Sequence, residues 1–278
     1  MIRESLVSAG FVGAWRAVRL LPEDAAHALF RRMADGIHKR NGRSVQQLRE
    51  NLAVAAPDAD LDVLTHDAVR SYLRYWCEAF RLPSWPIDDL IARSTVVGEE
   101  NVRGAYNGPG AIVALPHTAN WDWAGAWTSA TGMPVLAVAE RLRPQRVYDE
   151  FVAFRESIGM EIIPLDGEDT MARLVDGLAR KRLVCLLSDR DLSRSGIEVE
   201  LLGRPARVPT GPAILARRTG AAVVPATFAY AGRGMELTFY PPIEPGRPSR
   251  MMQSVADAFT SGIRAQPQDW HMMQRVFS

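Results

Sequence analysis

The chain has 278 residues, of which 47% are hydrophobic and 23% charged, and its formal net charge is +1. The length suits one large folded domain, and the near-neutral charge argues against a protein that binds nucleic acid through an overall positive surface. No apolar run approaches the roughly 18 residues that a membrane-spanning helix needs.

The first 82 residues predict a helical lead-in rather than a separate domain. The spacing of apolar residues predicts helices over residues 4–20, from Pro22 to about Ile37, from Ser44 to about Ala55, and from about Leu61 to Phe80. Ser44 and Gln47 form a capping-box pattern at the start of the third helix.

The N-terminal charge favours a membrane surface as one of two interpretations. Residues 1–56 hold nine basic and five acidic residues, an excess of +4. The apolar stripe of residues 4–20 either packs on the protein core or lies in the interface of a membrane. In the second case, anionic lipids attract each nearby basic group by about 1 kcal/mol.

From residue 94 onwards, strands and helices alternate. Strands are expected over 94–98, 111–115, 134–139, 160–164, 183–188, 197–202, 222–230 and 235–240, and helices over 100–107, 120–131, 144–158, 168–181, 209–219 and 248–264. This alternation predicts an α/β fold with a mainly parallel central sheet covered by helices on both faces. The expected organisation is a single domain over 1–278, with an α/β core over 94–278.

His117 and Asp122 are the strongest candidates for chemistry. The apolar run 111–115 predicts a buried strand, so His117 lies in the turn that leaves it and Asp122 on the first turn of the next helix. On one continuous helix, positions i and i+5 diverge by about 140°. The two side chains can therefore meet only if the histidine lies in the turn. In that arrangement Asp122 could orient the imidazole of His117 as a general base.

Spacing alone is a weak argument for this pair. Of the five histidines, only His117 is followed by an acidic residue at the fifth position. One such match among five histidines is close to an even chance, so the position between an apolar strand and a tryptophan-rich helix carries more weight.

The segment from Pro116 to Trp123 resembles the His-x4-Asp block of the glycerolipid and lysophospholipid acyltransferases. Its Asn-Trp-Asp form is similar to the branch that contains the lipid A late acyltransferases and the phosphatidylinositol mannoside acyltransferases. Three further segments resemble blocks of that branch: residues 70–83, residues 187–192 with 199–203, and residues 219–225. The wider family's third block is Phe-Pro-Glu-Gly, from which this sequence departs, so the resemblance leaves open which acid takes the glutamate's role.

The resemblance implies an acyl-CoA-dependent O-acyltransferase of lipid biosynthesis that needs no cofactor and no metal. His117 would be the general base, Asp122 would orient it, and the hydroxyl would attack the thioester directly. The acceptor would be a mannose hydroxyl of a phosphatidylinositol mannoside, receiving a palmitoyl-like group, with a lipid A precursor as the alternative acceptor. The enzyme would be peripheral on the cytoplasmic side of the plasma (inner) membrane and would use its N-terminal helices for contact.

Several further residues are expected at the substrate site. Charged residues that follow expected strands should line the cleft beside His117, because reactive groups gather at the carboxyl ends of parallel strands. The expected substrate-binding residues are Glu140, Arg143, Arg155, Asp189, Arg190, Asp191, Glu200 and Arg207. The aromatic residues Trp121, Trp123 and Trp127 are expected to form a wall of the acyl pocket, although a helix core would use them equally well.

Two other function classes stay open on the residues alone. A hydrolase would use His117 to activate water, with Asp189 and Asp191 holding a metal ion. A membrane-binding protein without catalysis would need only the charge and the apolar stripe of residues 1–56.

Overall fold

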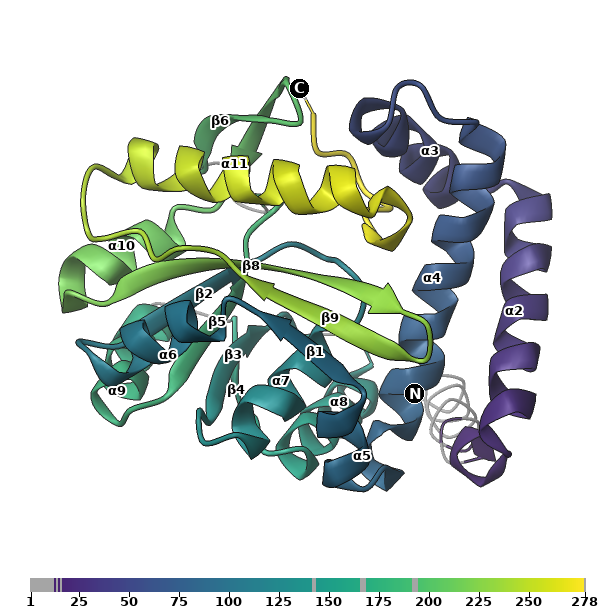
Figure 1. The fold of residues 1–278 in the computed structure, drawn as a ribbon, viewed down its shortest axis with the longest axis horizontal. Coiled ribbons are helices and arrows are strands. Elements are labelled where there is room, and N and C mark those ends of the chain that lie inside the picture. Colours follow the sequence, from purple (N-terminus) through teal and green to yellow (C-terminus); the bar gives the residue numbers. More distant parts are fainter. Residues whose placement is uncertain are drawn as a thin grey trace.

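The computed structural model describes residues 13, 15, 17–141, 144–165, 169–191 and 195–277. The strands of the main sheet are β1 (Ser94–Val97), β2 (Ala111–Leu115), β3 (Val135–Ala139), β4 (Glu161–Pro164), β5 (Leu183–Leu187), β8 (Ala222–Ala231) and β9 (Gly234–Phe239). Their order across the sheet is β1-β9-β8-β2-β5-β3-β4 (Figure 1). Strands β8, β2, β5, β3 and β4 run parallel, and β9 returns from β8 as an antiparallel hairpin.

Helices surround this sheet and precede it in the chain. They are α2 (Glu23–Arg40), α3 (Arg43–Ala55), α4 (Leu61–Arg81), α5 (Ile87–Ala92), α6 (Glu99–Asn107), α7 (Trp121–Ala130), α8 (Gln145–Ser157), α9 (Thr170–Ala179), α10 (Gly211–Thr219) and α11 (Pro248–Ala265), with short 3-10 turns η1 (Leu82–Ser84) and η2 (Pro267–Asp269). The expected helical lead-in is therefore present as α2, α3 and α4, which lie beside one edge of the α/β core (Figure 1).

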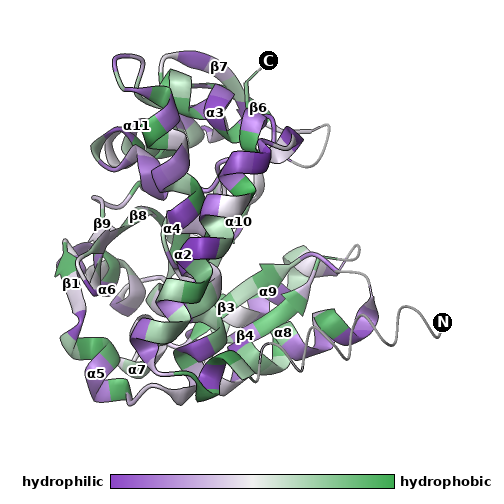
Figure 2. Cartoon of the chain, turned by 90° about the vertical axis from the view of Figure 1, so that its right-hand side faces the viewer, coloured by the Kyte–Doolittle hydropathy of each residue, from purple (hydrophilic) through white to green (hydrophobic). Residues whose placement is uncertain are grey.

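The two faces of the sheet pack against different helices because successive strand residues point to opposite faces. On β2, Val113 and Leu115 join a buried cluster that contains residues of α4, α7 and α8. Ile112 and Ala114 join a second cluster with residues of α9, α10 and α11. Figure 2 shows β3 and β4 in mainly hydrophobic colours, whereas the helices carry both colours. This arrangement confirms the predicted α/β fold with a mainly parallel sheet covered on both faces.

The lead-in helices share the core of the α/β unit. Phe30 of α2, Leu48 of α3 and Leu73 of α4 belong to the same buried cluster as Val113. Most of the apolar stripe predicted over residues 4–20 lies outside the described residues. Within the described part of the chain, no helix combines the length and the hydropathy needed to cross a bilayer.

The structure adds one local finding and corrects one local expectation. The strand expected at 197–202 is present as β6 (Ile197–Leu201), but it pairs only with β7 (Arg204–Val208) in a separate antiparallel hairpin. The apolar pattern missed β7 because that strand contains two arginines and a proline. The capping box at Ser44 is not used, since the N-cap of α3 is Gly42, two positions earlier, and Ser44 lies in the first turn of the helix.

Candidate active site

The turn between β2 and α7 carries the histidine–aspartate motif. His117 lies in this turn and Asp122 in the first turn of α7, as predicted. Ala119 adopts a φ of 46°, in the left-handed region that residues with a side chain disfavour. Asn120 caps α7, because its side chain accepts a hydrogen bond of 3.0 Å from the backbone N–H of Trp123. The turn is thus sharply bent and fixed at the start of the helix.

Asp189 holds the imidazole of His117. The two residues follow neighbouring parallel strands, β2 and β5, at the same edge of the sheet. Oδ1 of Asp189 lies 2.7 Å from Nδ1 of His117, and Oδ2 accepts a 2.9 Å hydrogen bond from the backbone N–H of His117. When Nδ1–H donates to the carboxylate, Nε2 carries the lone pair. No described residue hydrogen-bonds to Nε2, so this atom can accept a proton from a ligand.

The environment of Asp189 keeps its carboxylate ionised. Burial alone raises the pKa of Asp189, but the charge and the hydrogen bonds of His117, with a 3.0 Å hydrogen bond from the indole N–H of Trp270, outweigh burial. The net pKa of Asp189 therefore lies below its ordinary value of 3.8. A buried anion beside the imidazole favours the imidazolium form that His117 adopts when it takes a proton.

Asp122 does not make the expected hydrogen bond to His117. Its Oδ1 accepts a 2.7 Å hydrogen bond from Nε of Arg155, and its Oδ2 accepts a 3.0 Å hydrogen bond from the hydroxyl of Tyr75. Successive residues of a helix point about 100° apart, so Asp122 points away from His117 when its neighbour Trp121 faces the histidine. The buried Asp122 carboxylate instead joins α4, α7 and α8.

The ion pair of Asp122 and Arg155 lies next to two aromatic rings, Tyr75 and Trp121, that pack beside His117. The ring of Tyr75 stacks on that of Trp121, with centroids 4.2 Å apart. The edge of Trp121 meets His117 with centroids 5.5 Å apart and an interplanar angle of 82°. Asp122 therefore acts on the position of His117 through Tyr75 and Trp121 rather than by direct contact.

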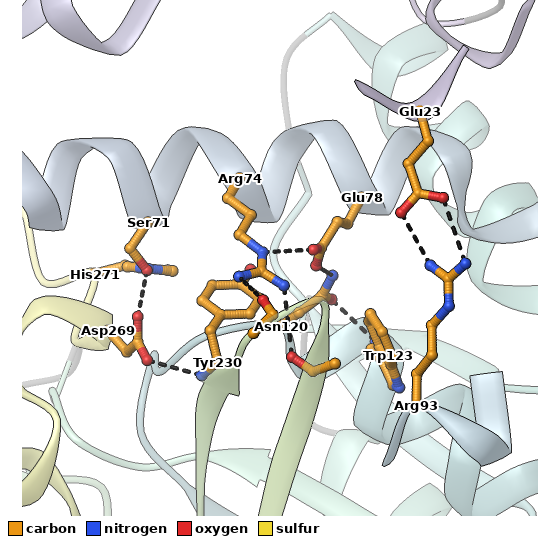
Figure 3. A network of polar contacts seen from close by, with 12 residues as sticks. Glu23, Ser71, Arg74, Glu78, Arg93, Asn120, Trp123, Tyr230, Asp269 and His271 are labelled. Carbon is orange, nitrogen blue, oxygen red and sulfur yellow. Dashed lines mark hydrogen bonds and ion pairs between the residues drawn. The ribbon is translucent and has the colours of Figure 1, made fainter. Parts of the chain in front are cut away.

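The C-terminal segment from Asp269 to His271 forms a second support for the turn. The backbone N–H of His271 donates to the carbonyl of His117 at 2.8 Å, and the N–H of Ala119 donates to the carbonyl of Asp269 at 2.8 Å. The side chain of Asp269 in turn accepts a 2.6 Å hydrogen bond from Ser71 of α4 (Figure 3). No local sequence pattern marks this segment, because its contacts are with a turn some 150 positions earlier in the chain.

Helix α4 also anchors the start of α7. Glu78 is 1% exposed, accepts a 2.7 Å hydrogen bond from Arg74 and accepts a 3.1 Å hydrogen bond from Asn120 (Figure 3). Burial raises the pKa of Glu78, although Arg74 opposes this shift. The guanidinium of Arg74 also lies 3.9 Å from the ring centroid of Tyr230. The side chain that caps α7 is therefore held by a buried acid of another helix.

An apolar cavity lies beside Trp121, the residue whose ring meets His117. It lies between the sheet and α7, and Trp121, Asp122 and Arg155 line it, whereas His117 and Asp189 are not among its lining residues. Its other lining residues are mainly small or apolar: Val113, Leu115, Ala124, Gly125, Thr128, Val135, Ala137, Val138, Met160, Leu183, Cys185, Leu187, Phe228 and Phe239. Leu115 and Leu187 line the cavity two positions before His117 and Asp189, and the lining residue Trp121 meets the ring of His117. A histidine close to an apolar cavity suits chemistry on a polar group that carries a long hydrocarbon tail.

Comparison with known proteins decides the family. The whole chain, residues 1–278, matches the family described as bacterial lipid A biosynthesis acyltransferase. The chain is 40% identical over 273 residues to the phosphatidylinositol mannoside acyltransferase of Mycolicibacterium smegmatis, with 95% of this chain and 89% of the relative covered. It is 39% identical over 274 residues to the phosphatidylinositol mannoside acyltransferase of Mycobacterium tuberculosis, with 95% of this chain and 86% of the relative covered.

This chain belongs to the bacterial lipid A biosynthesis acyltransferase family. The resemblance expected from the His-x4-Asp block is thereby confirmed, and the protein is an acyltransferase of lipid biosynthesis.

The acyltransferase brings only some of the expected site residues together. Asp189 and Arg155 lie at the site, where Asp189 binds His117 and Arg155 donates to Asp122. Asp191 instead closes its own loop, because its Oδ2 accepts a 3.0 Å hydrogen bond from the N–H of Gly196. Among the described residues, no group of three or more histidine, cysteine or acidic side chains is placed to hold a metal ion.

The remaining expected residues lie elsewhere or outside the description. Glu140 is exposed just after β3, and Arg190 is half-buried. Glu200 is exposed on β6, where its backbone N–H donates to Gln253 of α11. Arg207 is exposed on β7 and donates to the carbonyl of Gly196 at 3.3 Å. Arg143 lies outside the described residues.

Only one of the three expected tryptophans lines the cavity. Trp121 does so, whereas Trp123 is fully buried and donates a 2.8 Å hydrogen bond to Ser94. Trp127 is 4% exposed and packs against Phe239. Helical phase explains the difference, because residues 123 and 127 lie about one turn apart on the face of α7 that Trp121 does not share. Of the three expected tryptophans, Trp123 and Trp127 therefore do not line this cavity.

We expect Trp270→Phe to lower the stability of the acyltransferase and to change its pH–rate profile, because Trp270 donates a hydrogen bond to Asp189. The substitution keeps the buried ring but removes the indole N–H from Asp189, so the free energy of unfolding falls by about 1.5 to 3 kcal/mol. The carboxylate then binds protons more readily, and the acid limb of the pH–rate profile moves to higher pH. Urea unfolding and pH–rate measurements check these two effects.

Trp123→Phe is the matched control. Trp123 is also fully buried and also loses an indole hydrogen bond, but its partner is Ser94 rather than Asp189. It should lose stability without a shift of the pH–rate profile. A profile that shifts equally in both variants would contradict the assignment of Trp270 to Asp189.

Acid should destabilise the fold through His271. Burial, assisted by the charge of His117, lowers the pKa of His271 from 6.5 to about 3. The unfolded chain therefore binds a proton at His271 that the folded protein excludes, and stability falls as the pH drops from 6.5 towards 3, by at most about 1.4 kcal/mol per pH unit. His27 acts in the same direction, because burial lowers its pKa to about 4.

Urea unfolding between pH 7 and pH 4.5 tests this contribution. The stability of His271→Gln should fall less steeply with acid than that of the wild type. His38→Gln, at a half-buried position of α2, should keep the wild-type slope. Equal slopes in all three proteins would show that His271 is not held neutral by burial.

Proposed function

We propose that this acyltransferase moves a fatty acyl group, such as palmitoyl, from acyl-CoA to a mannose hydroxyl of a phosphatidylinositol mannoside. The observation that carries the chemistry is the His117–Asp189 pair, whose histidine contacts Trp121 of the apolar cavity. The acceptor is supported by the relatives, which are named phosphatidylinositol mannoside acyltransferases and align over 95% of this chain.

The proposed reaction is a direct transfer. Nε2 of His117 takes the proton of the mannose hydroxyl as its oxygen attacks the carbonyl carbon of the thioester. The tetrahedral intermediate then expels the thiolate of CoA, which receives the proton from the imidazolium, and the base is regenerated. Asp189 stays ionised throughout and stabilises the imidazolium. The reaction as written uses no metal and no cofactor besides the acyl-CoA donor.

Asp189 replaces Asp122 as the residue proposed to orient the base. Asp122 takes a positioning role, in which its bonds to Arg155 and Tyr75 hold Trp121 against His117. Arg155 is consequently assigned to this ion pair rather than to a substrate phosphate.

The cavity is proposed to hold the acyl chain. Leu115, the last residue of β2, and Leu187, two positions before Asp189, both line the cavity. Its mouth is therefore placed beside the catalytic turn. A chain inserted there would leave the thioester near His117 and would remove apolar surface from water, at about 0.8 kcal/mol for each buried methylene group.

We further propose that the enzyme is peripheral at the cytoplasmic face of the plasma membrane. Leu20 is 86% exposed just before α2, and Ile87 is 47% exposed on α5. The 2.9 Å ion pair of Glu23 with Arg93 places the start of α2 close to the end of α5. Apolar side chains exposed on these neighbouring elements, with the positive excess of residues 1–56, suit an anionic lipid surface. Sedimentation with phosphatidylinositol vesicles, reduced by high salt, is the expected result.

Incubation of the purified protein with radiolabelled palmitoyl-CoA tests the function. One reaction contains a mannosylated phosphatidylinositol, a second contains a lipid A precursor, and a third contains no acceptor. Label on the mannolipid alone supports the proposal, and label on the lipid A precursor alone replaces the acceptor. Label that appears only as free palmitate in every reaction would favour a hydrolase instead.

A further inference from the structure

The apolar cavity has a measurable depth along the sheet. It is lined by alternate residues of β5, namely Leu183, Cys185 and Leu187, which share one face of the strand. The four residue steps from Leu183 to Leu187 span about 13 Å. The cavity therefore extends roughly this far along β5, from the carboxyl ends of the strands towards their amino ends. An acyl chain that enters at Leu187 therefore runs towards Leu183.

Small residues provide the width of the cavity. Ala124 and Gly125 of α7 face Ala137 and Cys185 of the sheet across it. Burial raises the pKa of the Cys185 thiol to about 12, so this cysteine lines the cavity as a small, uncharged side chain. Together these four residues leave space between α7 and the sheet that larger side chains would fill.

Met160 reaches across this space from its deep end. Glu161 pairs with Leu136 in the sheet, so Met160 lies at the level of Val135, where β3 begins. A Cβ atom built on Gly125 would lie 2.7 Å from Sδ and 2.9 Å from Cε of Met160. The thioether of Met160 therefore occupies the place that a side chain of residue 125 would take, about one helical turn below Trp121.

The cavity wall continues to the deep end beside Met160. Thr128, one turn further along α7, and Val135 and Leu183, at the starts of their strands, line the same cavity. Methionine is unbranched and has several rotatable bonds, so its end can be displaced more easily than a branched side chain. Met160 is 7% exposed and thus moves within the protein rather than into solvent.

We propose that Met160, resting on Gly125, is the floor of the acyl cavity and limits the length of the acyl chain that the enzyme transfers. The assignment rests on the proposed function of the cavity as the acyl site. The floor follows from the packing of one flexible side chain against a glycine, and its position sets how many methylene groups fit between His117 and the deep end.

Transfer from a series of acyl-CoA donors, from lauroyl to arachidoyl, tests the floor. Met160→Ala opens the deep end, and the kcat/KM for a donor two carbons longer than the wild-type optimum should rise about tenfold relative to that optimum. Met160→Phe fills the space and should move the optimum to a shorter donor. Met133→Ala removes the same side chain from a buried position outside the cavity lining and should keep the wild-type optimum.

A wild-type length profile in active Met160→Ala and Met160→Phe would overturn the proposal. Binding provides a measurement independent of catalysis: the fatty acid that most raises the melting temperature should lengthen in Met160→Ala and shorten in Met160→Phe. An unchanged binding preference in a folded variant would also overturn it. If the wild type binds fatty acids with a length preference but transfers none from acyl-CoA, the proposed function fails while the floor is still decided by the binding series.

Discussion

His117→Ala should abolish measurable acyl transfer while the protein remains folded. A positioned general base contributes about 10²- to 10⁴-fold to a rate. No described basic side chain hydrogen-bonds to Nε2 of His117, so none is placed to replace the lost base. The loss of one donor to the buried Asp189 lowers the free energy of unfolding by about 1 to 3 kcal/mol, which a folded enzyme can tolerate. Rates with palmitoyl-CoA and the acceptor lipid, together with circular dichroism, measure both effects.

His38→Ala is the control for this variant. His38 lies on α2, where its Nε2 is 3.7 Å from Asp62, and it touches none of the residues of the catalytic turn. Its rate should equal that of the wild type. If His117→Ala also transferred the acyl group at the wild-type rate, the base would have to be another residue.

Asp189→Asn and Asp122→Asn should fail in different ways. An asparagine at 189 cannot stabilise the imidazolium, so kcat should fall about 10²- to 10⁴-fold with little change in KM. An asparagine at 122 leaves Arg155 without its carboxylate partner in a site where the side chain is only 18% exposed. Its main effect should be a loss of about 3 to 5 kcal/mol in unfolding free energy.

Steady-state kinetics and urea unfolding on both variants separate the two roles. We expect the larger fall in kcat for Asp189→Asn and the larger fall in stability for Asp122→Asn. The reverse pattern, with a stable but inactive Asp122→Asn, would return the orienting role to Asp122.

The placement of the site could be predicted from local sequence, but the acidic residue that binds His117 could not. The apolar run before His117 and the helix after it locate the turn correctly, because strand and helix periods are local properties. The strand that ends before Asp189 also marks its position, since parallel strands bring their carboxyl ends to one edge of the sheet. The sequence does not show that Asp122 faces Arg155, because that depends on how α7 is rotated against α8.

The support of the turn lies beyond local patterns altogether. Trp270 and His271 reach His117 and Asp189 from the end of the chain, after the last helix has crossed the sheet. Trp123 and Trp121 differ by two positions in a tryptophan-rich segment, yet one is core and the other lines the cavity. In both cases the outcome is set by tertiary packing, which the spacing of residue types does not encode.

Magnetic resonance of isotope-labelled histidine tests most directly whether Asp189 holds the base. The chain has only five histidines, so the imidazole signals can be assigned by substitution. We predict a strongly hydrogen-bonded Nδ1–H signal of His117 that is lost in Asp189→Asn and kept in Asp122→Asn. A signal kept in Asp189→Asn and lost in Asp122→Asn would contradict the His117–Asp189 pair and the mechanism built on it.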